Sequence, residues 1–166
     1  MNILQANIVD LWRQNNIVCI TTNGFVKKSG EGVLGRGNAL AMAKEIQELP
    51  KTLGDHIIKN GNVVGVIYNR VISFPVKPVT CEWDDALPHM QQKFKKGDEI
   101  AGFWCRAKLD IIENSLHQLI NLLNYYKTSK DIYLPMPGVG NGDLSIKEVQ
   151  PIIERYPDNR IIYCSL

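Results

Sequence analysis

The chain has 166 residues, of which 45% are apolar and 22% are charged, and these values are typical of one globular domain with one core. Its 19 basic and 17 acidic residues leave a net charge of +2, which is too small to indicate a nucleic-acid-binding protein by charge alone. The sequence contains no apolar run of about 18 residues, so no membrane span is predicted. The N-terminus lacks the basic start and long apolar stretch of a signal peptide, and we expect a cytoplasmic protein.

The cysteines are spread along the chain and form no Cys-x-x-Cys pair. They are Cys19, Cys81, Cys105 and Cys164. Isolated cysteines favour a reduced, cytosolic protein over a disulfide scaffold or a zinc site. We therefore expect four small buried thiols, no metal and no cofactor.

In chain order, the first predicted elements are strands over residues 3–9 and 17–22. The second is a continuous β-branched run, which is typical of a strand covered on both faces. It stops at the turn signal Asn23-Gly24. A stretch with four glycines follows at 30–37, and residues 38–46 then predict a helix.

The middle of the chain predicts a helical piece at 56–59 and two β-rich runs, 63–68 and 71–74, which are joined as a hairpin. Residues 78–102 show no clear periodicity and predict an insertion or lid with some helix. From 108 to 126 the apolar residues recur at helical spacing.

Towards the C-terminus, residues 131–136 predict a strand and 137–142 a second glycine-rich loop. Ser145, followed three residues later by Glu148, is a capping-box pattern that predicts the start of a helix. The last predicted strand covers 160–164.

Strands that alternate with helices predict an α/β fold, with a largely parallel sheet sandwiched between helices. In such sheets ligands bind beyond the carboxyl ends of the strands. Both glycine-rich loops leave from such ends and precede helices, where free backbone N–H groups favour an anion. The pair therefore indicates a ligand with two phosphates, although turn-forming glycines are the alternative for each loop alone.

Two familiar nucleotide motifs do not fit. Gly30, Gly32 and Gly35 have the G-x-G-x-x-G spacing, but seven residues separate Thr22 from Gly30. Asp55, the candidate ribose acid, lies behind a proline-broken helix, so a Rossmann site is disfavoured. The chain also lacks G-x-x-x-x-G-K-[ST], the P-loop signature.

Two charged residues stand at strand or loop ends. Lys77 is either a solvated surface charge or, if that strand end opens into the crevice, a lysine made nucleophilic by desolvation. Asp143 at the end of the second loop either serves a ligand or favours the following helix N-terminus. The three tryptophans, at 12, 83 and 104, are candidates for base stacking, with packing roles expected for at least two.

Several of these features together resemble the macrodomain family, whose members bind ADP-ribose. Asp10-Leu11 resembles the family's Gly-Asp-hydrophobic motif, with Val9 in place of the glycine. Residues 34–41 resemble the first phosphate loop, and 134–144 the second, with its Pro-x-x-Gly-x-Gly signature. The resemblance covers most of the chain apart from 78–102.

One branch of the family is especially similar. It includes phage-type ADP-ribose 1″-phosphate phosphatases and hydrolases that remove ADP-ribose from protein carboxylates or DNA. That branch shares a Phe-Pro-x-Lys strand end, here Phe74 to Lys77, and an acidic-apolar helix like 109–116. In the hydrolase that acts on protein carboxylates, a catalytic aspartate occupies the position of Gly142, and Asp143 lies one place later.

The resemblance implies a role for each matching residue. Asp10 would accept a hydrogen bond from the adenine amino group, and Leu11 would flank the ring. The glycine loops would hold the diphosphate and the distal ribose. Lys77, Asn23 and Asp143 would be the catalytic residues. The implied ligand-binding residues are Asp10, Leu11, Gly35, Gly37, Asn38, Pro137, Gly138, Val139, Gly140, Asn141 and Gly142.

The resemblance therefore implies a monomeric hydrolase that cleaves an ADP-ribose derivative at C1″. Its partner would be ADP-ribose or an ADP-ribosylated substrate, and nucleic acid only as ADP-ribosylated DNA. A reader that binds ADP-ribose without turnover is the first alternative. The second is an RNA- or single-strand-binding module that uses Trp83 and the basic residues of 93–96.

Overall fold

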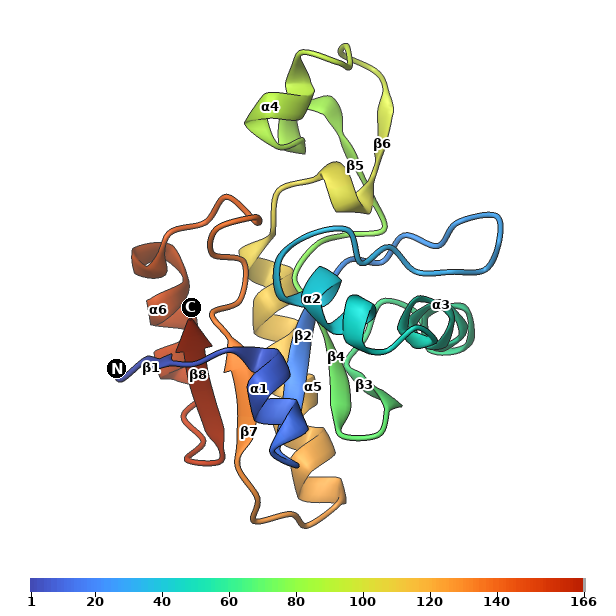
Figure 1. The fold of residues 1–166 in the computed structure, drawn as a ribbon. Coiled ribbons are helices and arrows are strands. Elements are labelled where there is room, and N and C mark those ends of the chain that lie inside the picture. Colours follow the sequence, from blue (N-terminus) through green and yellow to red (C-terminus); the bar gives the residue numbers. More distant parts are fainter. Residues whose placement is uncertain (166) are drawn as a thin grey trace.

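The computed structural model describes residues 1–165 and contains a six-stranded sheet between two layers of helices (Figure 1). The strands, in the order in which they lie side by side, are β1 (Leu4–Gln5), β8 (Ile161–Ser165), β7 (Ile132–Pro135), β2 (Ile17–Thr22), β4 (Val71–Pro75) and β3 (Gly65–Tyr68). Every neighbouring pair is parallel except β3 and β4, which form the predicted hairpin. The predicted α/β sheet, parallel in large part, is confirmed.

The helices are named in chain order. They are α1 (Ile8–Arg13), α2 (Gly37–Glu45), α3 (Leu49–Asn60), α4 (Pro88–Gln91), α5 (Leu109–Tyr125) and α6 (Ile146–Arg155), with two short 3-10 turns, η1 (Trp83–Asp85) and η2 (Gly102–Trp104). Among residues 1–165, none of these helices is long and apolar enough to cross a membrane.

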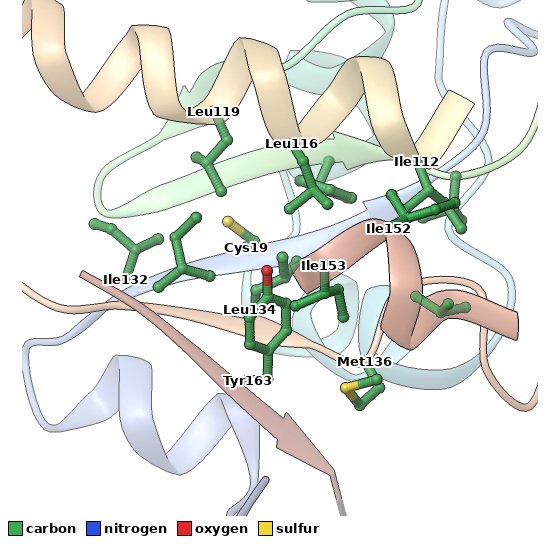
Figure 2. Close-up of a cluster of buried hydrophobic side chains, with 14 of the residues drawn as sticks. Cys19, Ile112, Leu116, Leu119, Ile132, Leu134, Met136, Ile152, Ile153 and Tyr163 are labelled. Atoms are coloured by element: carbon green, nitrogen blue, oxygen red, sulfur yellow. The ribbon is translucent and has the colours of Figure 1, made fainter. Parts of the chain in front are cut away.

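Side chains of the central strand alternate between the two helical layers. On β2, Val18 and Ile20 pack against α1, α2 and α3, whereas Cys19 packs against α5 and α6. Figure 2 shows this second core, with Leu116 and Leu119 of α5 lying over the sheet. Burial on both faces explains why β2 is a continuous apolar and β-branched run.

Two sequence-based boundaries are wrong. The strand predicted over 3–9 is limited to β1, because Asn7 caps α1 by accepting hydrogen bonds from the backbone N–H groups of Val9 and Asp10. The helical piece predicted at 56–59 begins at Leu49, with Pro50 in its first turn, where a missing N–H costs no hydrogen bond. The capping box of Ser145 and Glu148 at the start of α6 is confirmed.

Residues 78–105, here called the strap, stand off one end of the main sheet (Figure 1). Its strands, β5 (Thr80–Glu82) and β6 (Glu99–Ala101), pair with each other in a separate antiparallel sheet. A small core fills the strap, with Ala86 and Ile100 fully buried beside Trp83 and Phe94.

A disulfide joins Cys81 to Cys105 within the strap, so the expectation that all four cysteines are free thiols is wrong for this pair. The two cysteines are 24 positions apart and carry no local motif, but the return of the chain through β6 and η2 brings their Cα atoms to 6.1 Å. Cys19 and Cys164 are free and buried, as expected. Because disulfides are rare in reducing cytosol, the cytoplasmic location stays a prediction.

The first glycine-rich loop is held against α3 by close backbone packing. A Cβ at Gly54 would lie 1.8 Å from the carbonyl oxygen of Gly30. We expect Gly54→Ala to lower the free energy of unfolding by about 3 kcal/mol, because backbone atoms cannot rotate away from the added methyl group. At Gly61, at the end of the same helix, an added Cβ would lie in open space, and only the positive φ disfavours alanine. Gly61→Ala should therefore lower the free energy of unfolding by only about 1 kcal/mol. Urea denaturation of both variants tests this, and equal losses would contradict it.

Candidate functional site

A cavity of about 290 Å³ opens at the carboxyl ends of β2, β4 and β7. Both glycine-rich loops and the strap contribute to its wall. The lining residues are Thr21, Thr22, Asn23, Val33, Gly35, Arg36, Gly37, Asn38, Ala39, Val76, Lys77, Phe103, Trp104, Met136, Gly138, Val139, Asn141 and Gly142. A cavity of this size at this end of a parallel sheet is where an α/β protein binds a small ligand.

The first loop presents the amino end of α2 to the cavity. The side chain of Asn38 accepts a hydrogen bond from the backbone N–H of Thr21 at 3.0 Å and donates one to its hydroxyl at 2.9 Å. Asn38 therefore ties the first turn of the helix to the end of β2. The N–H groups of that turn have no partner inside the helix, and they point their positive dipole end at the cavity.

The second loop is a tight backbone turn between β7 and α6. Gly138 and Gly140 have φ of 76° and 79°, a region that favours glycine. In the described part of the chain, the backbone N–H groups of Gly138, Gly140, Asn141 and Gly142 find no protein acceptor. Unpaired N–H groups of successive turn residues form a concave site for an anion.

The two loops meet across the cavity. A Cβ at Gly37, whose φ is 58°, would lie 2.8 Å from the side-chain nitrogen of Asn141. The absence of a side chain at Gly37 therefore lets Asn141 of the second loop approach the start of α2. The two sets of backbone N–H groups face one shared space.

Asn23 follows β2 and is 7% exposed. Its side chain donates a hydrogen bond to the carbonyl of Val33 at 3.1 Å and accepts one from the backbone N–H of Phe25 at 3.0 Å. These contacts fix the amide at the cavity wall. One N–H of the side chain remains for a ligand or a water molecule.

Lys77 follows β4 and is 9% exposed, which is unusual for a lysine. Its backbone N–H donates to the carbonyl of Thr22, and its own carbonyl accepts a hydrogen bond from the Asn62 side chain at 2.9 Å. Its ammonium group makes a long contact, 3.4 Å, with the carbonyl of Phe103. Burial, aided by the positive charge of Arg36, lowers the pKa of Lys77 to about 8 from an ordinary 10.5.

The charged residues that line the cavity are all positive. Of the residues that line the cavity, Arg36 and Lys77 carry positive charge and none is acidic. Within residues 1–165, no three His, Cys, Asp or Glu side chains gather as a possible metal site. Two cations and two sets of free N–H groups make this cavity complementary to a ligand with two negative groups.

Comparisons with known proteins give no match to a family model or to a curated protein sequence. Solved structures do match. The macrodomain of DarG from Thermus aquaticus is 15% identical, with a TM-score of 0.64, and the match covers 99% of this chain and 97% of that chain. The macrodomain of DarG from Mycobacterium tuberculosis is 18% identical, with a TM-score of 0.61, over 100% and 94% of the two chains. The fold is that of a macrodomain.

A third match is the structure of DarTG from Thermosipho africanus in complex with ADP-ribose. It is 16% identical, with a TM-score of 0.58, and the match covers 90% of this chain and 38% of that chain. The expected macrodomain fold is confirmed. The more specific likeness to the phage-type branch stays a prediction.

Most of the residues that the macrodomain resemblance singles out come together in the cavity. They are Asn23, Gly35, Gly37, Asn38, Lys77, Gly138, Val139, Asn141 and Gly142. They come from three strand ends that are more than 50 residues apart in sequence. The parallel order of β7, β2 and β4 brings these ends to one edge.

The other predicted residues lie outside the lining: Asp10, Leu11, Pro137, Gly140 and Asp143. Asp10 lies within α1 and is near Arg13, with 3.8 Å between the charged groups. Asp143 forms an ion pair with Arg106 at 2.9 Å. Its implied role as an acid or base in catalysis therefore has no direct support from this geometry.

Other lining residues were not singled out by the sequence. They are Thr21, Thr22, Val33, Arg36, Ala39, Val76, Phe103 and Met136, whereas Trp104, which also lines the cavity, was a candidate for base stacking. Arg36 had a local signal, because it lies between two glycines just before a predicted helix. Phe103 had none, since only the return of the strap brings it into the same cavity lining as Lys77.

The other two tryptophans have packing roles, as expected. The indole N–H of Trp12 donates to the carbonyl of Asn69, and Arg70 lies over its ring at 5.1 Å. The indole N–H of Trp83 donates to the carbonyl of Gln91 inside the strap. Because Trp83 is held there, it is poorly placed for the stacking that the nucleic-acid alternative requires.

Proposed function

We propose that this macrodomain binds ADP-ribose, with the two glycine loops on either side of the diphosphate. The observation that carries the proposal is a cavity whose charged side chains are both cationic, Arg36 and Lys77, between two sets of backbone N–H groups. A diphosphate supplies two negative groups to this arrangement. The structure of DarTG with ADP-ribose supports the choice of ligand.

We further propose that the protein hydrolyses a bond at C1″ of an ADP-ribose derivative. In a glycohydrolase, the neutral amine of Lys77 attacks C1″ while the leaving group departs with the electrons of the broken bond. The proton that the amine loses as the adduct forms goes to the leaving group. Water then attacks C1″, the C–N bond breaks, and a proton from that water passes to the departing amine, so that ADP-ribose is released and the lysine is regenerated.

In a 1″-phosphate phosphatase, water attacks phosphorus and the P–O bond to the sugar breaks. The remaining side-chain N–H of Asn23 would orient that water, and the ammonium of Lys77 would stabilise the charge on the phosphate. The two reactions need different protonation states of one residue. A pKa of about 8 makes both states accessible near neutral pH.

A reader without turnover is the second candidate. It is favoured by the lack of any carboxylate among the lining residues and by the ion pair that occupies Asp143. Paired carboxylates, which most glycoside hydrolases use, are not provided here. The monomeric state and the cytoplasmic location stay predictions.

Calorimetry with ADP-ribose tests binding, and three substrates then test turnover: ADP-ribosylated protein, ADP-ribosylated DNA and ADP-ribose 1″-phosphate. Release of ADP-ribose or of phosphate identifies the reaction. Binding without release from any of the three would support the reader. No heat and no thermal shift at saturating ADP-ribose would refute the proposed function.

Arg36 should contribute to affinity through charge. We expect Arg36→Ala to weaken ADP-ribose binding about tenfold, the effect of losing one charge-assisted hydrogen bond. Arg36→Lys should recover part of the lost affinity, because lysine restores the positive charge but lacks the planar guanidinium group with its paired N–H donors. An exposed lysine far from the cavity, changed in Lys130→Ala, is the control. Equal affinities for Arg36→Ala and the control would contradict a role for Arg36.

A further inference from the structure

The strap is attached to the rest of the domain beside the cavity. It begins directly after Lys77, and Pro78 accepts a hydrogen bond from the backbone N–H of Gly24. It returns through Gly102, whose missing side chain lets its backbone pass the carbonyl of Pro78, since a Cβ would lie 1.9 Å from that oxygen. The two ends of the strap therefore pass each other at close range, and Phe103 and Trp104 of η2 line the cavity.

Phe103 and Trp104 of η2 form an aromatic wall on this side of the cavity. Their ring centroids are 5.0 Å apart, and Phe25, beyond the end of β2, packs edge-on against Phe103 at 5.4 Å. His89 of α4 packs edge-on against Trp104. Both wall residues are half-buried, so part of each ring is left for a ligand.

The same wall covers Lys77. The carbonyl of Phe103 accepts a hydrogen bond from its ammonium group, and Phe103 and Trp104 line the same cavity as Lys77. The cavity-lining residues from β2 and the second loop are uncharged, and Arg36 of the first loop is the one other charged residue in that lining. With no carboxylate to hold a proton on Lys77, its exposure to water decides its charge.

The disulfide lies at the base of this wall. Cys105 directly follows Trp104, and its partner Cys81 lies on β5, near the start of the strap. The backbone N–H of Leu87 also donates to the carbonyl of Trp104 at 2.9 Å. These two connections fix the end of η2 to the body of the strap.

We propose that Phe103 and Trp104 are positioning residues that keep water from Lys77 and direct its amine into the cavity, and that the Cys81–Cys105 disulfide holds them there. The catalytic consequence rests on the proposed function, whereas the shielding of Lys77 does not. A dithiol would reduce the disulfide and be oxidised itself, and each cysteine would gain a proton to become a thiol. Phe103 and Trp104 would then no longer be held in place. The reactivity of the cavity would then depend on the thiol redox state.

The direct test is the titration of Lys77 in the ligand-free protein. We would follow the side-chain resonance of Lys77 by NMR in protein with isotope-labelled lysine, and assign it by comparison with Lys77→Met. In the wild type the titration of Lys77 should have its midpoint at a pH of about 8. In the variant Cys81→Ser/Cys105→Ser, and in Phe103→Ala/Trp104→Ala, it should rise towards 10.5 as water reaches the amine.

Two further variants make the test specific. Trp104→Phe keeps an aromatic wall and should keep the midpoint near that of the wild type. Gln92→Ala, an exposed position on the strap away from the cavity, should leave it unchanged. A midpoint that stays near 8 in both the cysteine and the aromatic double variants would overturn the proposal.

Kinetics separate this proposal from the proposed function. If Lys77 is the nucleophile, a midpoint raised by one unit lowers the free amine, and hence kcat, about tenfold near neutral pH, with a smaller change in KM. If the wild type binds no ADP-ribose, the proposed function fails, but the titration still decides the role of the strap. A kcat that is unchanged although the midpoint moves would overturn the catalytic consequence of the proposal.

Discussion

Lys77→Ala should lower the turnover of the protein's substrate at least about 100-fold, the usual loss when a reacting side chain is removed. ADP-ribose affinity should fall by no more than about tenfold, because Arg36 and the backbone N–H groups of both loops remain. Burst or steady-state assays give the first quantity and calorimetry gives the second. Intact turnover in Lys77→Ala would show that the catalytic role assigned to this residue is wrong.

Lys77→Arg separates the two proposed reactions. Arginine keeps the positive charge but cannot lose a proton in a protein, so it cannot attack C1″. A glycohydrolase should therefore lose as much activity with arginine as with alanine. A phosphatase that needs only the charge should retain more activity with arginine.

The pH dependence adds an independent check on the same point. The pKa of Lys77 is lowered to about 8, so the amine is mostly charged below that pH and mostly neutral above it. Glycohydrolase activity should rise as the pH passes through about 8, whereas phosphatase activity that depends on the ammonium should fall. A flat profile across this range would contradict both versions.

Gly142→Ala should abolish most ADP-ribose binding, with at least a 30-fold loss of affinity, on the order of 2 kcal/mol. A Cβ at this position would lie 2.4 Å from the carbonyl oxygen of Gly138 and 2.8 Å from Ala107. The Gly138 carbonyl already accepts the backbone N–H of Leu144, and Gly142 accepts that of Ala107. The second loop must therefore shift, and its N–H groups lose their common direction.

The same shift should cost stability, about 1–3 kcal/mol. Ser145→Ala is the matched control, because loss of the capping box costs a similar amount, about 1 kcal/mol, just after the loop. The control should unfold at lower denaturant concentration but still bind ADP-ribose with nearly normal affinity. Equal binding by Gly142→Ala and Ser145→Ala would show that the loop's shape is not what holds the ligand.

The elements that could be predicted are those with strong local patterns. The β-branched run of β2, the apolar spacing of α5 and the capping box of α6 each depend on neighbours within a few residues. The start of α1 was missed because its cap is a single Asn7 within an apolar stretch that also suits a strand. Residues 78–102 lack any such periodic pattern, so the structure of the strap could not be predicted from the sequence.

Several predicted site residues lie together where chemistry and topology coincide. Lys77 and the glycine loops follow parallel strands, and the carboxyl ends of these strands necessarily share one edge of the sheet. Asp143 was singled out for its place after a loop, but its pairing with Arg106 is a contact between distant segments. A local pattern carries no information about such a contact.

By itself, the sequence determined the α/β class, the sheet between helices and the two glycine loops, because periodicity and turn residues act over short distances. Only the tertiary structure decided that Phe103 and Trp104 line the same cavity as Lys77 and that Cys81 pairs with Cys105. The physical reason is that burial and side-chain pairing depend on how chain segments cross in space. In our proposal, that crossing also sets how much water reaches the amine of Lys77 and therefore its charge.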